Sequence, residues 1–103
     1  MYKWKPITAS EFAELFERQY TELGVIEREN FDKFRVSFWL ATIKRSHSPK
    51  DEMVFVVAQK EDGVLYYDDV EYGFNISFID STGRILTPGG SQNTLKEAVH
   101  QWI

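Results

Sequence analysis

The chain has 103 residues, 43% of them hydrophobic, no cysteine, and sixteen acidic against twelve basic side chains, for a formal net charge of -4. This composition excludes disorder, a disulfide scaffold and a thiolate metal site, and the acidic balance argues against nucleic acid as a partner. The length predicts one domain, residues 1–103, because chains divide into several cores only above roughly 250 residues. Without an apolar run long enough for a bilayer or a signal peptide, we expect a cytoplasmic protein with no membrane contact.

The first expected element is a helix over residues 9–23. Thr8 and Glu11 have the spacing of a capping box, in which each satisfies a backbone amide of the other. Gly24 is placed to end this helix, and residues 27–30 are expected to form a charged connector. The apolar side chains that follow at helical spacing are Phe12, Leu15, Phe16, Tyr20 and Leu23.

The middle of the chain alternates between apolar and polar residues with period two, which indicates strands. Strands are expected over residues 34–43, 53–58, 64–69 and 74–79, with a short fifth one over 84–86. Asp62 and Gly63 predict a tight hairpin turn between the second and third. Because short turns join neighbouring strands, the sheet should be antiparallel.

A short helix is expected at the C-terminal end. Thr94 and Glu97 again have capping-box spacing, although Ser91 and Asn93 compete for the cap. Its apolar face consists of Leu95, Ala98, Val99 and Trp102. The predicted fold class is therefore α+β, with an N-terminal helix, an antiparallel sheet of four to five strands and a short C-terminal helix.

The densest candidate feature is the segment of residues 66–74, which holds three acids and four aromatic side chains. Tyrosines beside carboxylates are typical of protein interfaces, because the rings supply contact area and the acids attract a basic partner. The alternative is an acidic, solvated connection between two strands. The candidate partner-binding residues are Tyr66, Tyr67, Asp68, Asp69, Glu71 and Tyr72.

A second candidate is an apolar stripe on the first strand, formed by Trp39, Ala41 and Ile43. Residues 53–58 are apolar on both faces, so something must cover the second face of the sheet. We expect either helices on opposite faces or self-association through this stripe into a homodimer. Coverage by the chain's own termini, including Tyr2 and Trp4, is the competing explanation.

Catalytic, cofactor and metal sites are not predicted. His47 and His100 have no partner at ligand or general-base spacing, so we expect both to be solvated. Residues 89–91, Gly-Gly-Ser before a helix, could present amides to an anion, but a simple turn is favoured. A hydrolase or isomerase using buried carboxylates is a third possibility, without an oriented acid and base in the sequence to support it.

Small, acidic, cysteine-free α+β chains of this length resemble two groups: orphan proteins of bacterial mobile gene cassettes, such as integron cassettes, and toxin-immunity proteins. The resemblance implies a bacterial, cytoplasmic protein that binds itself or another protein, and Asp68, Asp69 and Glu71 would contact a basic toxin. The leading hypothesis is therefore a non-enzymatic protein-binding or self-associating domain. The alternative is a small-molecule-binding domain with an aromatic-lined pocket, since sixteen aromatic residues can surround a cavity.

Overall fold

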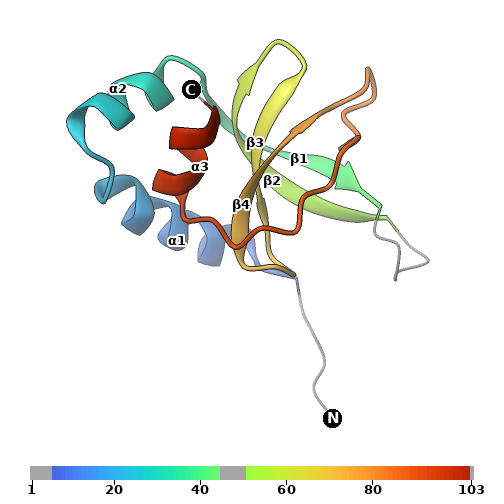
Figure 1. Cartoon of the computed structure of the whole chain (residues 1–103). Coiled ribbons are helices and arrows are strands. Elements are labelled where there is room, and N and C mark those ends of the chain that lie inside the picture. Colours follow the sequence, from blue (N-terminus) through green and yellow to red (C-terminus); the bar gives the residue numbers. More distant parts are fainter. Residues whose placement is uncertain (1–5, 45–50, 103) are drawn as a thin grey trace.

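The computed structural model describes residues 6–44 and 51–102 and has the expected α+β architecture (Figure 1). The elements are α1 (Ala9–Thr21), α2 (Val25–Asp32), β1 (Arg35–Ile43), β2 (Glu52–Lys60), β3 (Gly63–Asp68), β4 (Gly73–Phe78) and α3 (Leu95–Trp102). The four strands form one antiparallel sheet in the order β1-β2-β3-β4. Within these residues, no helix has both the length and the apolar character needed to cross a bilayer. Tyr2, Trp4 and His47 lie outside the described residues.

The capping box that starts α1 is confirmed. The Glu11 amide donates to Thr8 Oγ1 at 3.1 Å, and the Thr8 amide donates to Glu11 Oε1 at 3.0 Å. Hydrogen bonds from the backbone and hydroxyl of Thr8 lower the pKa of the Glu11 carboxyl, because they favour its charged form. The same reciprocal pair forms between Thr94 and Glu97 and starts α3, so Thr94 takes the cap there.

Thr8→Ala is expected to lower the free energy of unfolding by about 1 kcal/mol, because a first-turn amide loses its acceptor. Urea unfolding monitored by circular dichroism measures the change. Ser10→Ala is the matched control, since Ser10 is exposed on the same turn and should change stability by less than about 0.5 kcal/mol. Equal losses in the two variants would contradict the capping role of Thr8.

The expected charged connector at residues 27–30 is wrong, because these residues belong to α2. Gly24 does not end α1, which stops at Thr21, but begins α2: its amide donates to Glu27 Oε1 at 2.6 Å. Val25 and Ile26 are exposed at the start of α2, Glu27 and Arg28 are half-buried, and Phe31 is fully buried and anchors the helix. With a single buried apolar side chain in eight residues, the sequence has no apolar period that would distinguish a helix from a loop.

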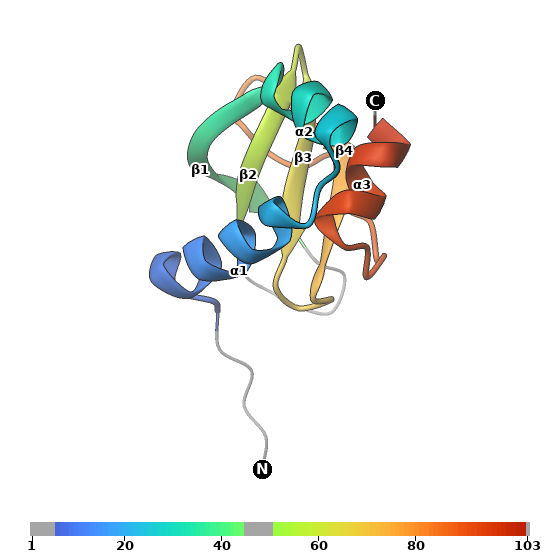
Figure 2. The same ribbon diagram turned by 90° about the vertical axis from the view of Figure 1, so that its left-hand side faces the viewer.

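All three helices lie on one side of the sheet, with β1 to β4 behind them (Figure 2). Phe12 is at the centre of the packing between the two layers: its ring stacks on Phe55 with centroids 4.6 Å apart and meets Phe38 edge-on at 5.0 Å. The buried members of this helix-side core are Phe12, Phe16, Leu23, Phe31, Val57, Ala58, Leu65, Tyr67, Phe74, Leu95, Ala98 and Val99.

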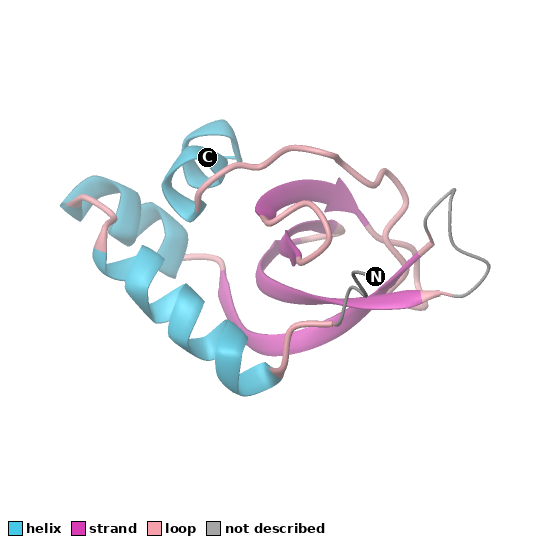
Figure 3. Ribbon diagram, turned by 90° about the horizontal axis from the view of Figure 1, so that it is seen from below, coloured by secondary structure: helices cyan, strands magenta, loops and turns pink. Residues whose placement is uncertain are grey.

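The other face of the sheet curls around a second apolar cluster (Figure 3). Its buried members are Ala41, Ile43, Val54, Val56, Val64, Tyr66 and Ile85. The chain after β4 closes this face, because Ile79 and Ile85 form a bridge and the Ile85 amide donates to the Thr42 carbonyl at 2.8 Å. The short strand expected over 84–86 thus appears as isolated bridges at Arg84 and Ile85, and it joins the end of β1 to the chain that follows β4.

Residues 89–93 then cross β4 and lead into α3. Two buried polar side chains hold this crossing segment: Asn75 exchanges hydrogen bonds with the backbone of Ser91, at 2.9 and 3.1 Å, and the Tyr66 hydroxyl accepts from the Gly89 amide at 3.0 Å. Gly73 is needed where the segment passes, because a Cβ there would lie 2.4 Å from the Cα of Gln92. The crossing is therefore fixed by backbone contact as well as by hydrogen bonds.

Candidate functional site

The segment 66–74 does not form the exposed contact surface expected from its composition. Tyr66, Tyr67, Asp68 and Asp69 are all buried, with at most 6% of their surface exposed. The physical reason is the place of β3 in the sheet: β2 and β4 pair with its two edges, the helices cover one of its faces, and the chain after β4 covers the other. Tyr66 belongs to the second apolar cluster and Tyr67 to the helix-side core.

Two carboxylates of this segment accept hydrogen bonds from backbone amides. Asp68 Oδ1 accepts the amides of Val70 and Glu71, at 3.0 and 3.2 Å, and so closes the turn from β3 to β4. Asp69 Oδ2 accepts the Ile7 amide at 2.9 Å, which links this turn to the chain just before α1. Of the six candidate residues, only the last two are accessible: Glu71 is half-buried and Tyr72 is 62% exposed.

A pocket of about 520 Å³ opens beside Asp69, between the start of α1 and the strands β1 and β2. We call it the Asp69 pocket. Its apolar lining consists of Pro6, Ile7, Ala9, Leu40, Met53, Val54 and Phe55. Its polar lining consists of Asp51, Glu52, Tyr67 and Asp69. A volume of this size with mostly apolar walls is typical of small-molecule sites, which span roughly 300–1,000 Å³.

Two polar groups reach this pocket from its buried side. Tyr67 is 3% exposed, and its hydroxyl makes no hydrogen bond within residues 6–44 and 51–102. Burial raises the pKa of Tyr67, and the neighbouring Asp69 charge adds to the effect, so the phenol stays neutral and able to donate. Asp69 supplies a carboxylate 6% exposed, with one oxygen on the Ile7 amide. The pocket therefore offers apolar contact together with a hydroxyl and a carboxylate.

These groups suit binding better than catalysis. Among the described residues, no histidine lines the pocket to act as a general base. Over the described part of the chain, no three His, Asp or Glu side chains come together as metal ligands. His100 lies away from the pocket, on α3, where it pairs with Glu27.

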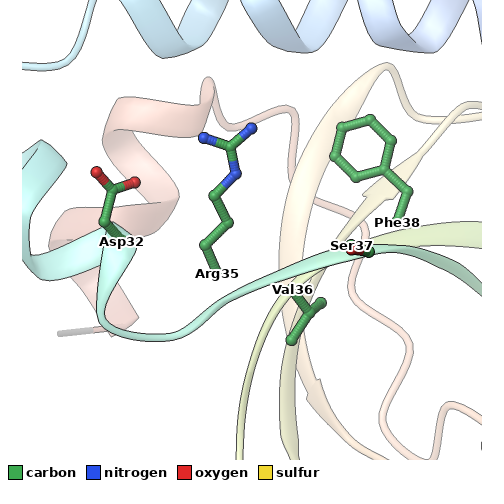
Figure 4. A pocket seen from close by; sticks show the side chains of 5 residues that line it. All are labelled: Asp32, Arg35, Val36, Ser37 and Phe38. Atoms are coloured by element: carbon green, nitrogen blue, oxygen red, sulfur yellow. The ribbon is translucent and has the colours of Figure 1, made fainter.

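A second, wider pocket of about 610 Å³ lies along β1 (Figure 4). Arg35 and Phe38 point from the strand toward α1, whereas Val36 points the other way. The Tyr20 hydroxyl donates to both carboxylate oxygens of Asp32, at 2.8 and 2.9 Å, and the Arg35 guanidinium lies 4.9 Å above the Tyr20 ring. The charged side chains of this pocket therefore contribute to the packing of α1, α2 and β1. The pocket itself is open to solvent.

The stripe expected to mediate self-association is covered by the chain itself. Ala41 and Ile43 have no exposed surface and pack with Ile85 in the second cluster. Trp39 is half-buried, with its ring against Gly83. Ala41 and Ile43 therefore cannot contact a second copy in this conformation. The chain after β4 covers the surface that a partner was expected to cover.

The edge of β1 is also poorly suited to pairing with another strand. The register with β2 shifts between Arg35 and Trp39, and Thr42 is already bonded to Gly83 and Ile85. Bulges and covered ends are common ways in which proteins protect an edge strand.

Two of the three backbone amides of residues 89–91 are likewise engaged within the chain. The Gly89 amide donates to Tyr66 and the Ser91 amide to Asn75, so these two amides fix the crossing, as the turn interpretation expected, and are not free to bind an anion.

Sequence reasoning selected Tyr67 and Asp69 but missed the rest of the pocket, chiefly Ile7, Leu40 and Met53. Leu40 lies on the helix side of β1 together with Phe38. Ile7, Leu40 and Met53 come from three separate segments, so no local pattern in the sequence brings them together.

Comparison with known proteins gives no relative: no family model, no curated protein and no solved structure matches the chain. A function has to be inferred from the geometry of its own residues.

Proposed function

We propose that the chain is a binding domain without catalytic chemistry, and that the Asp69 pocket holds a small, largely apolar molecule. One observation carries the proposal: the pocket combines about 520 Å³ of mostly apolar lining with the phenol of Tyr67 in its wall. The Tyr67 hydroxyl can donate a hydrogen bond to a ligand there, and the apolar walls can cover the body of that ligand.

The apolar contact would come from both layers. Leu40 and Met53 are 47% and 50% exposed at the sheet side of the pocket, and Ile7 and Ala9 line it from the start of α1. Covering the exposed parts of Leu40 and Met53 removes apolar surface from water, which favours binding by about 25 cal/mol per Å² before the cost of ordering the ligand.

The first test is an NMR titration with benzyl alcohol, a neutral probe with an apolar ring and one hydroxyl. The methyl resonances of Ile7, Leu40 and Met53 should shift saturably, with weak affinity in about the millimolar range. The methyl groups of Val25 and Leu86, which are exposed elsewhere, should not. Equal shifts at all five residues would indicate nonspecific contact and contradict the proposal.

A blocking variant strengthens this test. Ala9→Trp places a large ring at the pocket lining and should abolish the saturable shifts. Ala13→Trp is the matched control, since Ala13 is exposed on the same helix and does not line the pocket. Loss of binding in both variants would assign the effect to the helix as a whole.

The second candidate function is contact with another protein, as in an immunity or accessory protein of a mobile gene element. It is favoured by Tyr72, which is 62% exposed beside Glu71 at the turn from β3 to β4. A basic partner bound there should bind more weakly after Tyr72→Ala and at higher salt concentration.

Self-association is tested by light scattering. A monomer at every protein concentration would rule out the homodimer.

A further inference from the structure

We infer that Asp69 is a positioning residue of the pocket: its carboxylate holds the wall formed by Pro6 and Ile7 in place, and the affinity for a ligand depends on that wall. The inference rests on the proposed function and adds the residue that prepares the site for binding. Because Asp69 acts through Ile7, it does not have to contact the ligand.

The wall formed by Pro6 and Ile7 stands between two hollows. A second hollow of about 340 Å³ adjoins the Asp69 pocket, and the two share Pro6, Ile7, Tyr67 and Asp69 as lining residues. Pro6 is exposed and Ile7 is only half-buried, so this wall has fewer packing contacts than a segment inside the core. A directional bond is therefore needed to fix its position.

The Ile7 amide makes that bond. It donates to Asp69 Oδ2 at 2.9 Å, and the two residues are 62 positions apart in the sequence. Pro6 has no amide hydrogen, and the Thr8 amide is used in the capping box of α1. The Ile7 side chain also packs against the helix-side core. Because that packing is non-directional, the hydrogen bond decides where the wall lies.

Asp69 is the fixed end of this bond. It is 6% exposed, so little water competes for its carboxylate. It follows Asp68, whose carboxylate closes the turn by accepting the amides of Val70 and Glu71. A hydrogen bond to a carboxylate is stronger than one between neutral groups, and a negative charge just before the first turn of α1 is also favoured by the helix dipole. The carboxylate therefore joins a rigid turn to the wall of the pocket.

Hydrogen exchange measured by NMR tests the bond without any ligand. The Ile7 amide should exchange at least about tenfold faster in Asp69→Ala than in the wild-type chain, because local opening of the wall then costs less free energy. Asp69→Asn keeps an acceptor oxygen, and its Ile7 amide should stay within about threefold of the wild-type rate. The Gln59 amide, which donates to the Phe34 carbonyl away from the pocket, should exchange at the wild-type rate in both variants. Equal acceleration at Gln59, or an unprotected Ile7 amide in the wild-type chain, would overturn the inference.

NMR titrations with benzyl alcohol and toluene test the consequence for binding. Both probes should bind at least about fivefold more weakly to Asp69→Ala than to the wild-type chain, because the ligand then has to order the wall. Toluene has no polar group for a carboxylate to contact, so an equal loss for both probes assigns the effect to the wall. A loss for benzyl alcohol alone would indicate direct contact with Asp69 and overturn the inference. Asp69→Asn should keep both affinities within about twofold of wild type.

Glu71→Ala is the matched control, because it removes a carboxylate from the same turn at a residue that does not line the pocket. It should leave both affinities and the exchange of the Ile7 amide unchanged. Equal affinities of the wild-type chain and Asp69→Ala would overturn the inference and leave the proposed function standing. If neither probe binds to the wild-type chain at millimolar concentration, the proposed function fails together with the inference. If Asp69→Ala does not fold, the protection of the Ile7 amide in the wild-type chain decides alone.

Discussion

Phe12→Ala is expected to lower the free energy of unfolding by about 3–5 kcal/mol, the largest effect of any single substitution considered. Phe12 is completely buried, and its ring contacts Phe38, Phe55 and Tyr67, so it joins α1 to three strands. Removing the ring leaves a cavity that the rigid sheet cannot fill, and both the transfer free energy and the packing contacts are lost. Urea unfolding monitored by fluorescence measures the loss.

The matched control for this substitution is Phe78→Ala. Phe78 is 58% exposed at the end of β4, so the same chemical change should cost about 1 kcal/mol or less. If the two variants lost similar stability, the placement of Phe12 at the centre of the helix-side core would be wrong.

Gly73→Ala is expected to lower the free energy of unfolding by about 3 kcal/mol. A Cβ at Gly73 would lie 2.4 Å from the Cα of Gln92 and 2.5 Å from the carbonyl oxygen of Ser91. Both are backbone atoms, so no side-chain rotation relieves the overlap, and the crossing segment must move away from β4. That movement also breaks the hydrogen bonds between Asn75 and Ser91.

Gly90→Ala is its control, because a Cβ at Gly90 meets nothing within 4 Å. This substitution should be neutral or stabilise the protein by up to about 1 kcal/mol, since it restricts only the unfolded chain. Thermal unfolding of the two variants in parallel gives the comparison. Equal melting temperatures would contradict the close crossing of residues 89–93 over β4.

The parts of the fold that local chemistry determines were predictable. The capping pairs of Thr8 with Glu11 and of Thr94 with Glu97 involve residues three positions apart, and each correctly locates the start of a helix. The helix α2 was missed because its cap is formed by Gly24 and Glu27 and its burial by Phe31 alone.

The burial of the candidate site was not predictable from local patterns. Asp68 ends a strand that is central in the sheet and Asp69 follows it, and strand order is a non-local property. Likewise, Ala41 and Ile43 have the pattern of an uncovered stripe, and only the path of the chain after β4 covers them. The pocket arises from relative positions of α1, β1 and β2 that no single segment encodes.

A crystal structure of the chain with benzyl alcohol is the most direct test of the ligand pocket. The expected result is benzyl alcohol in the Asp69 pocket, with its hydroxyl within hydrogen-bonding distance of the Tyr67 hydroxyl and its ring against Leu40 and Met53. Benzyl alcohol bound only elsewhere on the protein, or a pocket that stays without it at saturating concentration, would contradict the account.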